Sequence, residues 1–262
     1  MISKQELRSE ARKRKVSLDL IEKDYVLGWV LCAISLSGIS SKVAFKGGTA
    51  LSKVYFPSNW RLSEDLDFTM LEDNKVEDIA KEQISDLPSV MREISGIDSR
   101  VKSIQRTVTF SLGCNTMGRS VGTPLKIEFS SEKFVGLIIK KDVPKVYDYA
   151  DFSILSYPID NILSEKMRTI LQRGKLRDYY DVWKLLKTTK FRPDYIRDMF
   201  AKKCQTKGVD FSEIDQFFPQ NLADNLKKHA KIGLTRLTSE LLPDIDALLR
   251  ELRSNMVQFF DQ

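Results

Sequence analysis

Two aspartates, Asp65 and Asp67, are spaced to act on one shared partner. Residues 62–70 alternate between polar and apolar side chains, which predicts a strand with Leu66 and Phe68 on the face opposite both aspartates. Alternate residues of a strand point to the same side, roughly 6.6 Å apart, and two carboxylates at that spacing repel unless a cation or solvent compensates them. A divalent metal ion supplies such a cation and also orients phosphate. The alternative is a solvated polar face on an edge strand.

The ligand types indicate which metal this pair would bind. Oxygen ligands alone favour Mg²⁺ or Mn²⁺ over zinc, and the single histidine, His229, excludes a histidine-rich metal site. We therefore predict that Asp65 and Asp67 bind Mg²⁺ or Mn²⁺. Residues 125–130 alternate again and put Glu128 on the polar face of a second predicted strand. Glu128 is the candidate third ligand, and an ordinary exposed strand glutamate is the alternative.

Two glycines separate a predicted strand, 43–45, from a predicted helix, 49–56. Glycine lets the backbone approach a bulky anion closely, and the first turn of a helix offers free N–H groups and a positive dipole end to phosphate. A tight strand-to-helix turn without a ligand is the alternative. The residues with which this turn would hold phosphate are Lys46, Gly47, Gly48 and Thr49.

The glycine turn and the aspartate pair together form a more specific pattern. Gly-Gly-Thr at 47–49, a short helix, a turn and then Ser-x-Asp-x-Asp at 63–67 resemble the signature of the DNA polymerase β-like nucleotidyltransferase superfamily. The resemblance implies that the glycine turn and its helix hold the phosphates of a nucleotide. It also implies that Asp65 and Asp67 bind the metals and that a carboxylate on a later strand, here Glu128, completes the site.

A third motif lies farther along the chain. Lys166 falls on one predicted helix, and the next helix begins with Arg-Asp-Tyr-Tyr-Asp at 177–181. With the two earlier motifs, in this order, the chain resembles the AbiEii toxin family. The resemblance implies that Ser63 and Asp65 are the Ser-x-Asp positions of that family and that Lys166 and Asp181 are its later essential pair.

The residue types of the third motif also suit phosphate binding by themselves. Lys166 is a compact cation suited to triphosphate oxygens as charge develops, and a lysine on the surface is the alternative. Asp178 and Asp181 are one helical turn apart, so both can face one partner. Arg173 or Arg177 can pair with them or grip phosphate through two hydrogen bonds. A surface of salt bridges within one helix is the alternative for this segment.

These arguments define two sets of site residues. The predicted catalytic residues are Ser63, Asp65, Asp67, Lys166 and Asp181. The predicted nucleotide-binding residues are Lys46, Gly47, Gly48, Thr49, Ser63, Lys166 and Arg177.

The elements that must position these residues divide the chain in two. Residues 18–32 show helical apolar spacing with Ser17 placed as the cap, and the predicted strands follow. From about residue 160 the pattern is helical, with an interruption at Gly174. We predict an α+β protein: a small mixed β-sheet nucleotidyltransferase core flanked by helices in residues 1–155, and a helical C-terminal part in residues 156–262 that completes the active site.

Composition narrows the partners. The 42 Lys and Arg against 36 Asp and Glu give a net charge of +6, which fits a nucleotide or nucleic acid, although solubility alone is the alternative. Basic clusters at 8–15, 202–203 and 227–231 suit an RNA backbone or are solvated faces. The longest apolar run, 25–36, is too short to span a bilayer, and the N-terminal segment lacks a signal-peptide pattern. Three scattered cysteines form no disulfide framework. We expect a cytoplasmic protein without a membrane partner.

The sequence therefore predicts a Mg²⁺-dependent nucleotidyltransferase that uses NTP. By the AbiEii resemblance it is a toxin of a toxin–antitoxin or phage-defence pair, with a cognate antitoxin, and an RNA acceptor such as the tRNA 3′ end. A metal-dependent nuclease also uses acidic clusters, but the restriction-type pattern requires Glu-x-Lys where this chain has Glu-Phe-Ser at 128–130. A non-catalytic nucleotide-binding interaction module is the remaining alternative, and the intact aspartates and Lys166 argue against it.

Overall fold

The computed structural model describes residues 2–71, 76–105, 109–115, 123–130, 135–238 and 240–260. The chain forms two compact units, one of Met1–Phe134 with Ile138–Tyr157 and the other of Val135–Leu137 with Pro158–Gln262. The observed boundary thus falls between Tyr157 and Pro158, two residues beyond the predicted one. None of the described helices is long and apolar enough to cross a membrane.

The N-terminal unit begins with two helices, α1 (Lys4–Lys13) and α2 (Leu18–Leu36). The Ser17 hydroxyl accepts a hydrogen bond from the backbone N–H of Leu20 at 3.3 Å, as expected of an N-cap. Most of α2 is buried and apolar on all sides, which is the pattern of a helix inside a core. The predicted helix and its cap are therefore confirmed.

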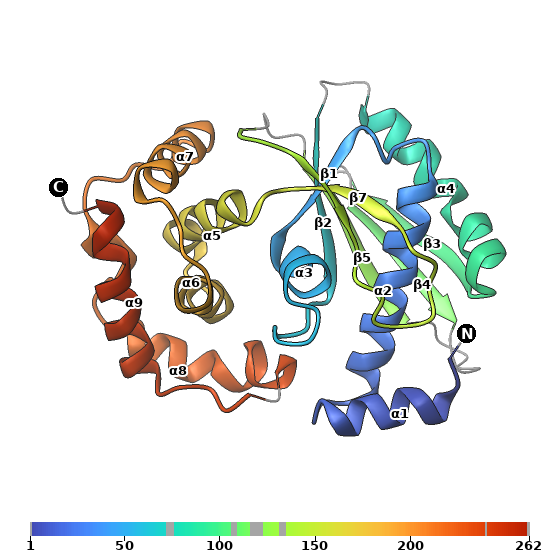
Figure 1. Cartoon of the computed structure of the whole chain (residues 1–262), viewed down its shortest axis with the longest axis horizontal. Helices are drawn as coiled ribbons and strands as arrows, with labels where there is room; N and C mark the ends of the chain where they lie inside the picture. The colour runs from blue at the N-terminus through green and yellow to red at the C-terminus, as the bar shows by residue number, and fades with distance from the viewer. Residues whose placement is uncertain are drawn as a thin grey trace. The chain divides into compact units, whose positions relative to one another are not determined.

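A seven-stranded mixed sheet forms the body of this unit (Figure 1), in the order β3-β4-β5-β2-β1-β7-β6. Its central strand β2 pairs antiparallel with β1 and parallel with β5. The strands are β1 (Val43–Lys46), β2 (Asp65–Met70), β3 (Asp98–Gln105), β4 (Thr109–Asn115), β5 (Thr123–Ser130), β6 (Ile139–Asp142) and β7 (Ser153–Ser156). The mixed sheet with flanking helices confirms the predicted fold class.

The central strands separate an apolar face from a polar one. Phe68 of β2 lies between Phe45 and Phe129, with ring centroids 5.2 and 5.1 Å apart. Helix α2 contacts β2 and β5, and α4 (Val76–Ser95) contacts α2 and β3. The opposite face carries the alternate residues of the same strands, including Asp65 and Asp67. The predicted alternation of β2 and β5 is thereby confirmed.

The helical segment after β1 has two parts. Helix α3 (Gly47–Ala50) continues directly into the π-helix η1 (Leu51–Tyr55). The prediction that β2 begins at residue 62 was wrong, since the strand begins at Asp65. The preceding residues are held by side-chain contacts instead: Glu64 pairs with Lys23 at 3.6 Å, and Arg61 is buried.

The C-terminal unit is helical, as predicted. Its first helix ends at Gly174, whose φ of 52° is the left-handed conformation that closes many helices. Part of its core is a cluster of phenylalanine rings in contact with one another, among them Phe200, Phe211, Phe217 and Phe260. The elements are α5 (Ile159–Arg173), α6 (Leu176–Thr188), α7 (Pro193–Thr206), η2 (Ile214–Phe217), α8 (Leu222–Gly233), η3 (Thr235–Leu237) and α9 (Ile245–Phe260).

Candidate functional site

The glycine turn lies against the aspartate pair. Gly47 has φ 77°, and a Cβ built on it would lie 2.6 Å from Oδ2 of Asp67. A Cβ on Gly48 would lie 2.8 Å from Nη2 of Arg61 and 3.5 Å from Oγ of Ser63. Side chains of the Ser-x-Asp-x-Asp segment therefore occupy the space that any larger residue in the turn would need. Both glycines are required by this close approach, and Gly47 also by its backbone conformation.

Two residues of the predicted phosphate turn are held by protein groups. The Thr49 hydroxyl donates to the backbone carbonyl of Asp65, so it joins the start of α3 to the start of β2. Lys46 is buried, donates to Oγ of Ser130 at 3.1 Å, and lies 5.8 Å from the ring centroid of Tyr157. The first N–H groups of a helix have no acceptor within it. The backbone at the start of α3, more than these two side chains, is suited to phosphate.

The two aspartates share a strand face with a basic and an acidic residue of β5. Asp65 pairs in register with Lys126, and Asp67 with Glu128. All four side chains are partly exposed. Lys126 is bonded to Glu128, and this hydrogen bond, together with the charges of Glu128, Asp65 and Asp67, raises the pKa of Lys126 although burial opposes the shift. Three carboxylates thus surround one cation.

This donor set fits Mg²⁺ or Mn²⁺ with two protein ligands. Such ions are commonly held by one or two carboxylates together with substrate phosphates, and Asp65 and Asp67 supply the carboxylates. Within the described residues, no group of three or more histidine, cysteine, aspartate or glutamate side chains is arranged to hold a metal ion. Glu128 is bonded to Lys126, so it would join the ligands only after leaving that contact.

Arg61 is a candidate site residue that the sequence analysis did not select. Its side chain is only 2% exposed, and its guanidinium lies against Gly48. One nitrogen donates to the carbonyl of Leu62 at 3.2 Å. The available signal was an arginine between Trp60 and Leu62, both apolar, directly before the Ser-x-Asp-x-Asp segment. A charged residue among apolar neighbours is informative because a buried charge requires compensating partners.

Lys166 lies in a buried ion cluster within the C-terminal unit. Its Nζ is 3.1 Å from Asp178 and 2.8 Å from Asp181, and both carboxylates are fully buried. Arg173 adds two hydrogen bonds to Asp178, at 2.8 and 3.0 Å. The expectation that Asp178 and Asp181 face one partner is confirmed, and that partner is Lys166. The alternative of a surface lysine was wrong, because Lys166 is only 7% exposed.

The charges of this cluster balance. Burial would raise the pKa of Asp178, but Lys166 and Arg173 outweigh it and hold that pKa well below its usual range. Two cations thus compensate two carboxylates. Arg177 stands outside the cluster: it is half-buried and, among the residues that the structure describes, makes no ion pair.

The predicted site residues therefore form two groups, one in each unit. The N-terminal unit brings together the glycine turn, Ser63, Asp65, Asp67 and Glu128. The C-terminal unit brings together Lys166 and Asp181, with Asp178 and Arg173 as partners that the site prediction had not included.

Comparison with known proteins agrees with this arrangement. The mixed sheet, glycine turn and paired aspartates are those of a nucleotidyltransferase. The family model described as nucleotidyl transferase AbiEii toxin, type IV toxin–antitoxin system, matches residues 29–252. The chain belongs to this family, and it is a nucleotidyltransferase of the AbiEii toxin type. The family implies a nucleotide substrate and a cognate antitoxin.

Solved structures share the fold. The chain is similar to the MenT4 nucleotidyltransferase toxin from Mycobacterium tuberculosis, with a TM-score of 0.72 and 16% identity over 100% of this chain and 91% of that one. It is also similar to JHP933 from Helicobacter pylori, with a TM-score of 0.57 and 17% identity over 93% of each chain. A search of the curated proteins finds no match.

Proposed function

We propose that this nucleotidyltransferase uses Mg²⁺ or Mn²⁺ to transfer a nucleotide from NTP to the 3′ end of an RNA, with tRNA as the leading acceptor. The observation that carries the proposal is the close approach of Asp67 to Gly47, where an added Cβ would lie 2.6 Å from Oδ2 of Asp67. It makes the phosphate turn and the metal ligands one continuous surface. The net charge of +6 supports a nucleic-acid acceptor.

The reaction exchanges one phosphoryl oxygen bond for another. The 3′ oxygen of the acceptor forms a bond to the α-phosphorus of NTP, the bond from that phosphorus to the β-phosphate oxygen breaks, and pyrophosphate leaves. The hydroxyl proton passes to solvent. The metal, held by Asp65 and Asp67, would lower the pKa of the hydroxyl and neutralise phosphate charge. The backbone of Gly48 and Thr49 would hold the triphosphate, with Ser63 beside it.

The C-terminal motif contributes differently in this proposal. Arg177 is the better candidate for direct contact with a phosphate of the acceptor, since it makes no ion pair within the described residues and arginine binds phosphate through two hydrogen bonds. Lys166 is already compensated by Asp178 and Asp181. We propose that Lys166 holds the start of α6, and with it Arg177, in position.

The test incubates purified protein with each labelled NTP and total RNA, and maps the RNA 3′ ends. Wild type should extend the ends, whereas Asp65→Asn should extend none and keep its unfolding free energy, since it removes like-charge repulsion. Asp151→Asn is the matched control, because Asp151 is 91% exposed in the same unit. Shortened RNA with wild type would favour the nuclease reading. Transfer by Asp65→Asn at the wild-type rate would refute the metal site.

Growth arrest provides the second test. Wild type expressed without an antitoxin should arrest growth and extend cellular RNA 3′ ends, whereas Asp181→Ala should do neither. Blocked acceptor ends would stop aminoacylation and hence translation. Growth arrest by both proteins with unchanged RNA would refute the catalytic proposal and favour a non-catalytic nucleotide-binding interaction module.

A further inference from the structure

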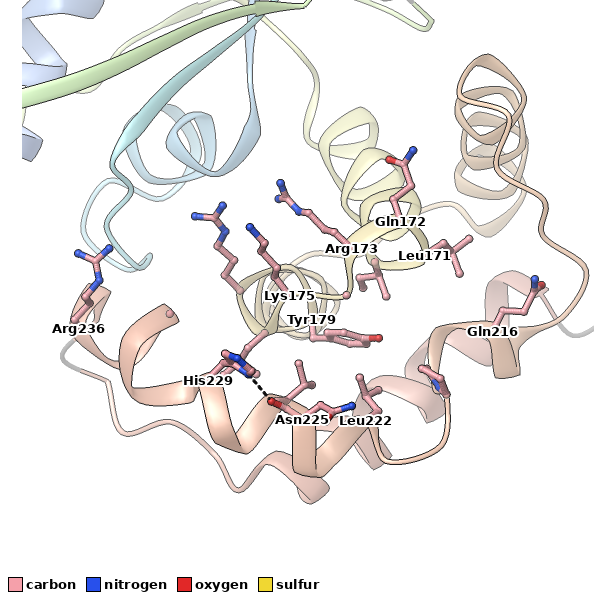
Figure 2. A pocket seen from close by; sticks show the side chains of 17 residues that line it. Leu171, Gln172, Arg173, Lys175, Tyr179, Gln216, Leu222, Asn225, His229 and Arg236 are labelled. Atoms are coloured by element: carbon pink, nitrogen blue, oxygen red, sulfur yellow. Dashed lines mark hydrogen bonds between the residues drawn. The ribbon is translucent and has the colours of Figure 1, made fainter. Parts of the chain in front are cut away.

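A pocket of about 760 Å³ lies within the C-terminal unit. Its size is within the range of sites that hold small molecules, on the order of 300 to 1,000 Å³. Figure 2 shows that one wall comes from the turn between α5 and α6 and the other from α8, with Tyr179 between them. The end of α5 and the turn that follows contribute Gln172, Arg173 and Lys175, and α8 contributes Leu222, Asn225 and His229.

The ionisable side chains at the mouth of this pocket are basic. Arg173, Lys175, His229 and Arg236 are exposed, and Arg177 is half-buried. No aspartate or glutamate occurs among the lining residues that the structure describes. Within the same part of the chain, Lys175 and Arg177 make no ion pair. The pocket mouth is therefore positively charged and suited to a phosphate group.

The inner surface is apolar and rigid. The Tyr179 hydroxyl donates to the carbonyl of Phe217 at 2.7 Å, which fixes its ring. The floor is formed by buried side chains, namely Ile170, Leu176, Tyr179, Leu222 and Leu226. A cationic mouth above an apolar floor is complementary to a nucleotide, which has a charged phosphate and a flat base.

The single histidine of the chain, His229, is suited to stacking against a nucleotide base. One ring nitrogen of His229, Nδ1, is 2.9 Å from the carbonyl oxygen of Asn225, so the exposed ring is oriented by its own helix. Unpaired RNA bases stack on aromatic rings, histidine included, and are read along their edges by hydrogen-bonding groups. The side-chain amides of Gln172 and Asn225 line the same pocket and can serve as such groups.

Three lysines of the basic clusters at 202–203 and 227–231 do not offer the same charge. Lys202 pairs with Asp198 at 2.6 Å, and Lys227 pairs with Asp246 at 2.6 Å. Lys203 is buried and lies 3.3 Å from Glu165. These three lysines have local partners, whereas Lys175 and Arg177 make no ion pair within the part of the chain that the structure describes.

We propose that this pocket binds the 3′-terminal nucleotide of a single-stranded RNA acceptor. Lys175 and Arg177 hold its phosphates, and its base lies on His229 over the apolar floor. The inference rests on the proposed function. RNA is favoured over free NTP because every lining residue belongs to the C-terminal unit, while the glycine turn and the aspartate pair, which would hold the NTP phosphates, belong to the other.

The test measures binding without turnover. The probe is a short single-stranded RNA with 2-aminopurine as its last nucleotide, titrated with full-length protein in EDTA without NTP. Anisotropy of a 5′ label gives Kd, and 2-aminopurine fluorescence reports stacking. His229→Ala should raise Kd about tenfold and abolish the fluorescence change, as expected for loss of one stacked base. Lys175→Gln should raise Kd and reduce the slope of log K against log salt by about 0.7.

Lys228→Gln is the matched control, because Lys228 is exposed, lies beside His229 on α8 and does not line the pocket. It should keep the wild-type fluorescence change and a Kd within about twofold of wild type, as expected of one solvent-screened surface charge outside the pocket. An equal loss of binding in Lys228→Gln and Lys175→Gln would show that RNA binds through non-specific charge attraction, and it would overturn the proposal that the pocket is the binding site. Binding of ATP is measured in EDTA by competition against a fluorescent ATP analogue. If the pocket variants bind ATP more weakly but bind RNA as wild type does, the pocket is an NTP site and the inference is overturned.

The two proposals fail in different ways. If wild type binds and extends RNA, and both pocket variants bind the probe as tightly with the same fluorescence change, the pocket inference is wrong and the proposed function stands. If wild type binds no RNA and transfers nucleotide to none, the RNA acceptor is wrong, and the pocket inference fails with it.

Discussion

Replacing Lys166 by methionine separates a positioning role from a direct role in chemistry. Methionine keeps the length and the apolar stem of the side chain but removes its charge. Asp178 would retain Arg173, whereas Asp181 would lose the cation 2.8 Å away. Because Asp181 is fully buried, its charge cannot be compensated by solvent in the folded state. The substitution therefore removes from the buried Asp181 a cation that solvent cannot replace.

The magnitude follows from the burial of the pair. Removing one partner of a buried ion pair costs about 3 to 5 kcal/mol, because the other charge remains desolvated. We expect Lys166→Met to lower the unfolding free energy of the C-terminal unit by about that amount. Lys166→Met with Asp181→Asn should recover part of the loss, since the buried group that lost Lys166 is then neutral.

The assay is urea unfolding followed by the fluorescence of Trp183, which lies on α6 of the same unit; variants with Trp29 and Trp60 replaced by phenylalanine serve as background. The pH dependence adds a check. The pKa of Asp178 is lowered in the folded state, so its stabilising contribution is present above its ordinary pKa, about 4, and is lost as pH falls through the lowered value. The wild-type advantage over Lys166→Met should therefore shrink below about pH 4.

A variant that unfolds at the wild-type urea concentration and yet transfers nucleotide far more slowly would refute this reasoning. Lys166 would then act on the triphosphate itself, as the sequence alone had predicted. If the double variant were as unstable as Lys166→Met, the charge of Asp181 could not be the cause of the lost stability.

Two further substitutions test the N-terminal group. Gly47→Ala should lower the unfolding free energy by about 1 to 3 kcal/mol and abolish transfer, since φ is 77° and the new Cβ meets Asp67. Gly208→Ala, with φ 59° and no neighbour within 4 Å, is the control for backbone strain alone. A Gly47→Ala variant that still transfers nucleotide would contradict the importance of this close approach. Lys126→Met should tighten Mn²⁺ binding about threefold, because it removes a cation that is bonded to Glu128 and whose repulsion of the metal is partly screened by solvent. The measurement is electron paramagnetic resonance of free Mn²⁺. Weaker Mn²⁺ binding would show that Lys126 supports the carboxylates.

The features of the fold that could be predicted from the sequence are those set by local patterns. The alternation of residues 125–130, the cap at Ser17 and the helix end at Gly174 each depend on neighbouring residues, and each is confirmed. The start of β2 depends on distant partners instead. Lys23, far away in the sequence, holds Glu64 outside the strand, and no local pattern reports such a contact.

Contacts between distant segments could not be read from the sequence. Strand β7 was not predicted, and it pairs parallel with β1 through Phe45 and Ser156. The pairing of Lys166 with Asp178 and Asp181 was also not predicted, because the sequence analysis gave Lys166 to the triphosphate, with a surface lysine as the alternative. Its burial depends on Asp178 and Asp181 arriving from the next helix. The pocket beside that helix likewise needs the α5–α6 turn and α8 together.

The two carboxylate pairs of this chain differ in the source of their compensating charge. Asp178 and Asp181 receive theirs from Lys166 and other residues of the same unit, and they can therefore be fully buried. Asp65 and Asp67 are only partly buried. A pair that takes its cation from solution must stay accessible, because a sealed pair could neither load nor release a metal ion. From this difference in exposure we propose that the strand pair binds the metal and that the helical pair has a structural role. Mn²⁺ binding should accordingly be lost in Asp65→Asn and retained in Asp181→Asn, and the reverse result would exchange the two roles.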